Sequence, residues 1–123
     1  MIPDNDLVDL QSFDSRGRTT LSVYLQLDTP QRRDSAYDEF VQQMQQRLAE
    51  CDPHPECREA IKEDMEIVDL YLRTNGHRQH AGLAIFSCAA ELFWRAFPLS
   101  VPVPTQVAVG SKFHVEPLKQ PVA

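Results

Sequence analysis

The sequence has 123 residues, of which 42% are hydrophobic and 24% are charged, and its formal net charge at pH 7 is −6. This length and composition predict one globular domain that buries about two-thirds of the surface of its unfolded chain. They exclude a membrane span, because no run approaches the roughly 18 apolar residues that cross a bilayer. The first residues lack the basic and apolar regions of a signal peptide, so we expect a cytoplasmic protein with no membrane partner.

The negative charge is concentrated in one stretch of the chain. Residues 34–69 hold eleven acidic side chains against three basic ones, a local charge of −8, whereas residues 70–123 hold two against five. Because an acidic surface repels phosphate, a broad nucleic-acid interface is not expected there. Contact with RNA would need local basic spots, which are Arg16, Arg18, Arg32 and Arg33.

The first elements in chain order are a turn of helix at residues 9–13, a loop around Gly17 and a strand from Thr20 to Asp28. Apolar and polar residues alternate along this strand, which predicts one face buried in the core. Tyr24 lies on the polar face, where it can stack on a base or a partner side chain. A helix that covers this face explains Tyr24 more simply.

Two amphipathic helices should follow. Asp34 or Ser35 can cap the first, since Ser35 and Asp38 match a capping box. The second should begin near Pro55 and end at Asn75-Gly76. The apolar stripes are Tyr37, Phe40, Val41, Met44 and Leu48 in the first helix, and Cys57, Ile61, Met65, Val68 and Leu72 in the second, which Ile67, Leu70 and Tyr71 widen. A short linker between them predicts an antiparallel helical hairpin on the sheet.

The most hydrophobic stretch, Gly82 to Leu99, predicts two further strands. Leu83 to Cys88 suits a strand covered on both faces, and Leu92 to Phe97 suits a second strand that Pro98 ends. We expect the pair to form a hairpin at the centre of the sheet. Thr105 to Val109 predicts another strand, with Lys112 to Val115 as its continuation or short partner.

These elements predict an α+β domain over residues 1–116. It has a mostly antiparallel sheet of about four strands, in the chain order β-α-α-β-β-β, with a helical hairpin packed on it. Residues 117–123 carry two prolines among polar residues, which is typical of the start of a linker to a further domain.

No motif predicts catalysis or a cofactor. Cys51, His54 and Cys57 lack the fourth ligand and the tight pairs of a metal site, so no metal is expected. His77 and His80 are expected to be solvated loop histidines, and an enzyme that uses them ranks last among the functions considered. Glu59, Glu63 and Glu66 lie opposite the core stripe of their helix, where charges are normally solvated. Ser22 and Ser87 lack the surroundings of a nucleophile.

A series of short blocks suggests a relationship to a known family. The blocks are Leu21–Leu25 with Asp28, Gly82–Phe86, Phe93-Trp94, Phe97–Leu99, Pro102–Pro104, Val107–Gly110, His114 and Pro117-Leu118. In order and spacing they resemble the N-terminal domain of the bacterial relatives of the archaeo-eukaryotic class-one peptide release factors. In that family a second domain carries a Gly-Gly-Gln loop that helps to hydrolyse peptidyl-tRNA, and this sequence has no Gly-Gly pair. The Asn-Ile-Lys-Ser decoding motif is also absent from the linker at residues 51–55.

The resemblance implies a non-catalytic N-terminal module in translation, which positions a downstream peptidyl-tRNA hydrolase-type domain on the ribosome or on tRNA. The candidate RNA or partner contacts are Arg16, Arg18, Arg32, Arg33 and Tyr24. The alternative is a protein-interaction domain without an RNA role, whose acidic helical face meets a basic partner.

Overall fold

The computed structural model describes residues 4–50, 55–74 and 80–119. The elements in chain order are α1 (Asp4–Ser12), β1 (Thr20–Gln26), α2 (Pro30–Glu50), α3 (Pro55–Thr74), β2 (Gly82–Cys88), η1 (Ala89–Glu91), β3 (Phe93–Leu99), β4 (Gln106–Gly110) and α4 (Glu116–Lys119). The predicted α+β class and the chain order of the strands and two long helices are confirmed. None of the described helices is long and apolar enough to span a membrane.

The sheet has four antiparallel strands in the order β3-β2-β1-β4. β1 lies inside the sheet, where Val23 is paired with Ile85 of β2 and with Val107 of β4. The β2–β3 hairpin forms as predicted, but only β2 is central. The expectation of a central position for β3 is wrong, because β3 is an edge strand.

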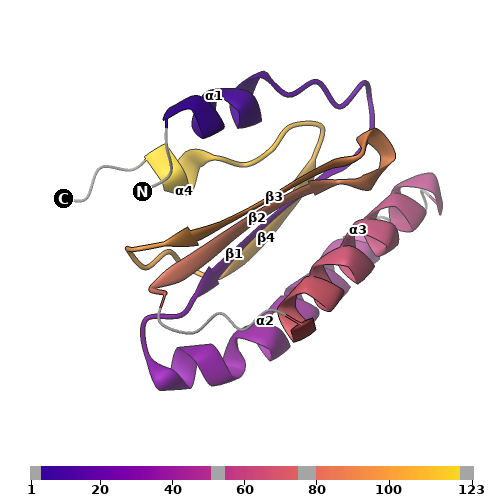
Figure 1. Cartoon of the computed structure of the whole chain (residues 1–123). Coiled ribbons are helices and arrows are strands. Elements are labelled where there is room, and N and C mark those ends of the chain that lie inside the picture. The colour runs from indigo at the N-terminus through magenta and orange to yellow at the C-terminus, as the bar shows by residue number, and fades with distance from the viewer. Residues whose placement is uncertain (1–3, 51–54, 75–79, 120–123) are drawn as a thin grey trace.

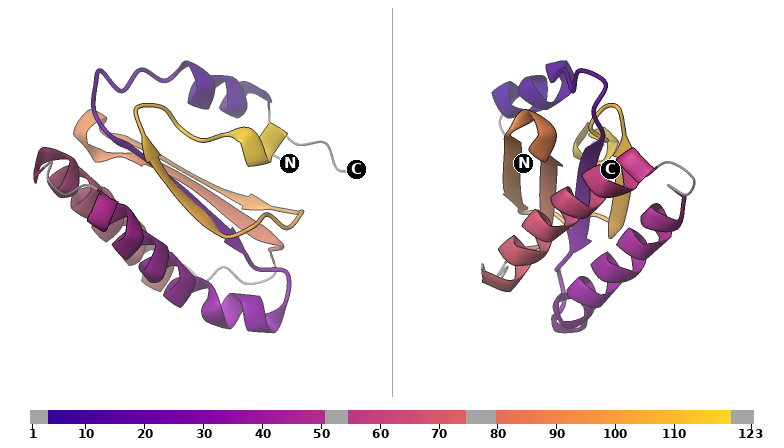
Figure 2. Two further views of the ribbon diagram at one scale, coloured as in Figure 1. Left: turned by 180° about the vertical axis from the view of Figure 1, so that it is seen from behind. Right: turned by 90° about the vertical axis from the view of Figure 1, so that its right-hand side faces the viewer.

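Two layers cover the sheet, one on each face. α2 and α3 lie against one face, and α1 with the segment that leads into α4 lies over the other (Figures 1 and 2). Both faces carry a hydrophobic core. The first core includes Leu21, Val23, Leu25, Phe40, Met44, Ile61, Val68 and Ile85, and the second includes Leu10, Tyr24, Phe86, Phe113, Val115 and Leu118.

The prediction of a single buried face on β1 is therefore wrong. Every residue from Thr20 to Leu25 is buried. The positions that alternate with the leucines, including Ser22 and Tyr24, face the second layer. There the backbone N–H of His114 donates a hydrogen bond to Ser22 Oγ over 2.9 Å.

Most of the predicted stripe positions of the two long helices pack in the core against the sheet, but Tyr37 is exposed, and α2 begins earlier than expected. Its first turn starts at Pro30, and the backbone N–H of Arg32 donates to Thr29 Oγ1 over 3.1 Å. Thr29 is therefore the N-cap, and proline at the first helical position has no N–H to leave unpaired. α3 ends at Thr74, and the predicted stop at Asn75-Gly76 lies outside the described residues.

At both edges of the sheet, side chains form hydrogen bonds with backbone groups of the edge strand or of the residue just before it. At β4, the Gln43 side chain of α2 accepts from the Val107 N–H over 2.9 Å and donates to the Thr105 carbonyl over 3.1 Å. At β3, the Arg95 guanidinium donates to the Trp94 carbonyl over 2.7 Å. Pro98 is paired with Leu83 inside β3 instead of ending it, which an edge strand allows. These features reduce the tendency of either edge to add a further strand.

Residues 112–115 form no strand, contrary to expectation. They run over the second face of the sheet, where the hydroxyl of Tyr24 donates to the carbonyl of His114. α4 follows, and Leu118 is only 5% exposed. Packing against the sheet thus extends to Leu118, and residues 120–123 lie outside the described part of the chain.

Candidate functional site

The four arginines predicted to contact RNA lie at opposite ends of β1. Arg16 and Arg18 belong to the loop before the strand, and Arg32 and Arg33 belong to the first turn of α2 after it. Strands rise about 3.3 Å per residue, so the length of β1 separates the two pairs by roughly 20 Å. The structure therefore does not bring the four cations together into one basic surface.

Three of these arginines have intramolecular partners. Arg16 Nε lies 3.3 Å from Glu91 Oε1 of η1, and the Arg16 side chain is still 78% exposed. Arg32 lies 3.8 Å from Glu39. Arg33 donates to the Leu27 carbonyl over 3.0 Å, which fastens the start of α2 to the end of β1. Arg33 therefore has a structural role, whereas Arg16 and Arg18 extend into solvent.

Tyr24 cannot contact RNA or a partner in this fold, because its side chain is fully buried. Its hydroxyl is bonded to His114, and its ring packs edge-on against Phe86 with centroids 5.8 Å apart. Burial, together with the charge of Glu116, raises the pKa of Tyr24 above its usual range. The simpler explanation, that another element covers this face of β1, is therefore correct. The part that contacts the Tyr24 hydroxyl is an irregular segment at His114 and not the helix that was expected.

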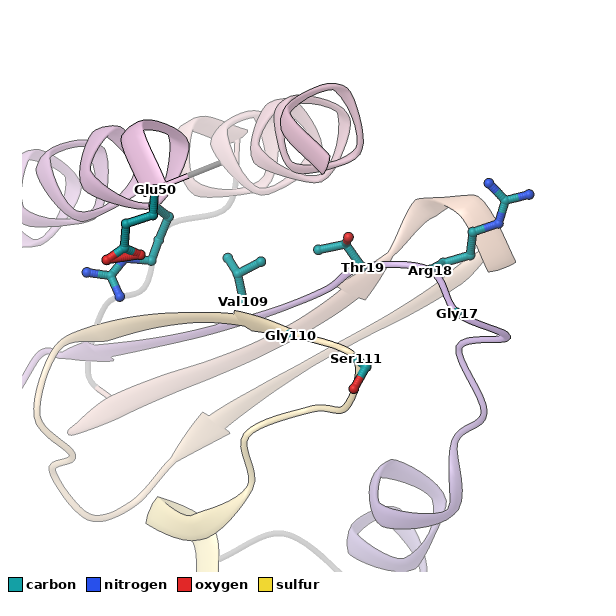
Figure 3. A pocket seen from close by; sticks show the side chains of 8 residues that line it. Gly17, Arg18, Thr19, Glu50, Val109, Gly110 and Ser111 are labelled. Atoms are coloured by element: carbon teal, nitrogen blue, oxygen red, sulfur yellow. The ribbon is translucent and has the colours of Figure 1, made fainter. Parts of the chain in front are cut away.

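A hollow of about 310 Å³ lies between the start of β1, the end of α2 and the turn after β4 (Figure 3). Arg18 and Arg47 are among its lining residues, which makes it a candidate anion site. The Arg18 side chain, however, points away from Val109 and Glu50 (Figure 3). Arg47 Nε lies 3.4 Å from the Glu50 carboxylate, so that acid already neutralises the second cation. The two cations do not converge, and the hollow does not have the geometry of a phosphate site.

Sequence reasoning missed a buried polar cluster between α3 and the end of β2. Asp64 is 2% exposed and Ser87 is 1% exposed. Asp64 Oδ1 accepts a hydrogen bond from Ser87 Oγ over 2.5 Å and one from the Ala89 N–H over 2.8 Å. The signal was available, because an acid stands between Ile61 and Val68 in the apolar stripe of the helix. Such a position is either destabilising or paired.

The chemistry of this cluster is structural. Burial raises the pKa of Asp64, and the two hydrogen bonds from Ser87 and Ala89 lower it in part. A serine hydroxyl that donates a hydrogen bond to a carboxylate has the arrangement of a nucleophile and its general base. With both side chains closed to solvent, no substrate reaches Ser87 Oγ. The pair instead fastens α3 to the sheet.

The outer side of the helical layer carries exposed apolar side chains. Tyr37 of α2 is 37% exposed, and Ile67 and Leu70 of α3 are 39% and 59% exposed. Ile67 and Leu70 were predicted to widen the apolar stripe of α3, but among the described residues no element covers their side chains. A groove of about 430 Å³ separates the two helices, with Val41, Leu48 and Met65 among its apolar lining residues and Lys62, Glu66 and Asp69 among its charged ones.

The groove is closed by polar contacts at one end. The Tyr37 hydroxyl donates to Asp69, and this hydrogen bond raises the pKa of Tyr37. Arg73 also pairs with Asp69, at 2.5 Å, one turn along α3. The Tyr37–Asp69 hydrogen bond joins the two helices, and Arg73 holds Asp69 from within α3. Ile67 and Leu70 form the apolar surface outside the groove.

The residues considered for metal binding and acid–base chemistry are only partly described. Cys51, His54 and His77 lie outside the described residues, as does the side chain of Cys57, and His80 is exposed. Within residues 4–50, 55–74 and 80–119, no group of three or more histidine, cysteine or acidic side chains could hold a metal ion.

The comparisons with known proteins identify a fold and no family. No protein-family model matches this chain, and no curated protein matches it. A solved structure described as an archaeal protein has the same fold, with a TM-score of 0.67 over 92% of this chain and 14% sequence identity. The present chain spans 32% of the length of that protein. At this identity the likeness concerns the fold alone.

Proposed function

We propose that this chain is a non-catalytic accessory module of a release-factor-like protein, which positions a peptidyl-tRNA hydrolase-type domain on the ribosome or on tRNA. The observation that supports an accessory role is that the same fold makes up about a third, 32%, of a longer solved chain. A fold of this kind can thus form one domain of a larger protein. The translation role rests on the resemblance in the sequence blocks.

In this proposal the RNA-facing surface is the end of the sheet at the β2–β3 turn. Arg16 and Arg18 are exposed there, and Arg16 already reaches Glu91 in that turn. Arg95 of β3 is exposed as well, with its guanidinium 4.6 Å from the centre of the Phe93 ring. Arginine is suited to phosphate contacts, and each such contact makes binding salt-dependent.

The test uses the full-length protein that carries residues 1–123 and measures its retention on ribosomes and on tRNA. Deletion of residues 1–123 should abolish retention. The double variant Arg16→Gln and Arg18→Gln should weaken tRNA binding and lower its logarithmic salt slope by about 1–2, because up to two phosphate contacts are lost. The matched control, Arg32→Gln and Arg73→Gln, removes the same charge from the opposite end of β1 and from the last turn of α3, and it should leave binding unchanged. Equal binding by the two double variants would contradict the proposed surface.

The second candidate function is a protein-interaction domain with an acidic face. The observation that favours it is the pair of exposed apolar side chains on α3, Ile67 and Leu70, which have Glu63 and Glu66 as exposed neighbours. Binding to a basic protein that weakens with salt, without retention of tRNA, would support this candidate and oppose the first.

A further inference from the structure

The outer surface of α3 carries a continuous apolar strip. Ile67 and Leu70 are three residues apart, so their side chains are neighbours on the helix surface. Tyr71 follows Ile67 by one turn and packs against Trp94 of β3, with ring centroids 5.3 Å apart. The apolar surface therefore extends from the exposed side of α3 to the edge strand. We call Ile67, Leu70, Tyr71 and Trp94 the α3 strip.

Acidic side chains flank the strip at its N-terminal end. Glu63 lies one turn before Ile67, and Glu66 lies one turn before Leu70. Both glutamates are exposed and, with Glu59, they line a hollow of about 530 Å³ that reaches Ala90 of η1.

Two cations also line this hollow, Arg18 and Lys62. Lys62 and Glu66 both also line the groove toward α2. The acids within one turn of Ile67 and Leu70 on the N-terminal side are Glu63 and Glu66. The cations at the other end of the strip are Arg73, which is paired with Asp69, and Arg95, which donates to the Trp94 carbonyl.

The edges of the sheet favour a helical partner over an added strand. Gln43 occupies the outer backbone groups of β4, and Arg95 and Pro98 interrupt those of β3. A helix with one apolar stripe needs no free backbone groups on the surface that it binds, and it lays that stripe on an apolar surface.

We propose that the α3 strip binds a basic amphipathic helix of a partner protein. The apolar stripe of the partner packs on Ile67, Leu70 and the edge of Trp94, and its Lys or Arg side chains lie against Glu63 and Glu66. The two glutamates at the N-terminal end of the strip favour a basic helix, since an acidic one would bring like charges together there. This inference rests on the second candidate function and names the class of partner for that face.

The experiment uses a tryptophan-free helical peptide of Lys and Leu, about 15 residues long, because shorter helices are marginal in water. Its control has Glu in place of Lys and the same Leu positions. Trp94 is the single tryptophan of the chain, so its fluorescence reports on the strip. We expect the basic peptide to change Trp94 emission and to shift backbone NMR signals of α3 and β3. The acidic peptide should bind at least about tenfold more weakly.

Substitutions locate the contact on the protein. Leu70→Ser should weaken binding of the basic peptide by about tenfold, because it removes apolar contact area at an exposed site. The matched control is Leu92→Asn, which removes an even more exposed leucine, 95% accessible, from the β2–β3 turn. The double variant Glu63→Gln and Glu66→Gln should reduce the salt dependence of binding. Thermal melts of the variants verify that they remain folded.

The possible outcomes separate the strip from the broader proposals. If the basic peptide binds and Leu70→Ser and Leu92→Asn are equally affected, the α3 strip is refuted while an acidic interaction face remains. If neither peptide binds at low salt, both the α3 strip and the acidic interaction face are refuted. If a single-stranded RNA shifts the α3 signals in place of the basic peptide, the strip is an RNA contact and the inference is wrong. The release-factor proposal is judged separately, by the arginine variants.

Discussion

Replacing Asp64 with alanine leaves two buried donors, the Ser87 hydroxyl and the Ala89 N–H, without their acceptor. Each buried group without a partner costs about 1–3 kcal/mol. Part of this loss is offset, because the buried carboxyl that is removed was itself poorly solvated. We therefore expect the free energy of unfolding to fall by about 2–4 kcal/mol, a large share of the roughly 5–15 kcal/mol typical of a domain.

The replacement of Asp64 with asparagine tests the charge separately. Asparagine keeps a side-chain carbonyl for both donors, so the loss of stability should be smaller, about 0–1.5 kcal/mol. Because the pKa of Asp64 is raised on folding, the folded state binds this proton more tightly than the unfolded state. Its contribution to stability is therefore largest below the unfolded pKa of about 3.9. The contribution is lost as the pH rises through the folded pKa. The wild type loses this contribution as the pH rises from about 4 to 7, and Asp64→Asn has no such titration. The difference in the free energy of unfolding between the two proteins should therefore shift in favour of Asp64→Asn over this range.

The assay is urea unfolding at pH 4, 5.5 and 7, followed by far-UV circular dichroism and by Trp94 fluorescence. Glu59→Gln is the control, since it removes an exposed acid of the same helix that does not contribute to the raised pKa of Asp64, and it should leave both stability and its pH dependence unchanged. A cycle with Ser87→Ala measures the coupling between Asp64 and Ser87 directly. The reasoning is refuted by a loss under about 0.5 kcal/mol in Asp64→Ala, or by an unchanged pH dependence in Asp64→Asn.

Three further predictions follow from the same structure. Tyr24→Phe removes the hydrogen bond to the buried segment at His114 and should lower stability by about 1–2 kcal/mol in a thermal melt; no change would mean that the segment leaves the sheet in solution. Leu92→Asn should raise stability by about 0.5–1 kcal/mol, because φ at this exposed leucine is 56° and asparagine tolerates that conformation better. Gln43→Ala frees the outer edge of β4, so size-exclusion chromatography at rising concentration should show more association than in the wild type, and a strictly monomeric variant would contradict the protective role of Gln43.

The candidate site shows what local sequence reasoning can and cannot supply. The exposure of Arg16 and Arg18 follows from their polar, glycine-containing loop. The structural role of Arg33 does not, because its partner is a carbonyl whose position depends on how α2 folds back onto β1. Sequence reasoning did not use the position of Asp64 as an acid within an apolar stripe, and its acceptor role became visible only when β2 was placed beside α3.

The start of α2 illustrates competition between two valid local signals. Ser35 with Asp38 and Thr29 with Pro30 are both reasonable helix starts on local chemistry. The longer helix forms because residues before Ser35 also find partners, as Arg33 does at Leu27. Pro98 is a similar case, since a proline ends a central strand but is tolerated at an edge, and position in the sheet is not a local property.

The sequence by itself determined the elements whose signal is periodic: the strand of alternating leucines, the two amphipathic helices and the apolar hairpin strand. Periodicity is a local property, because a side chain's direction depends on its own backbone geometry. Only the tertiary structure decided which faces are covered and which remain open. Tyr24 is buried by a segment that lies 90 residues further along the chain, whereas Ile67 and Leu70 stay exposed although they are equally apolar. Burial depends on what packs against a residue, and that neighbour is chosen by the topology of the whole chain.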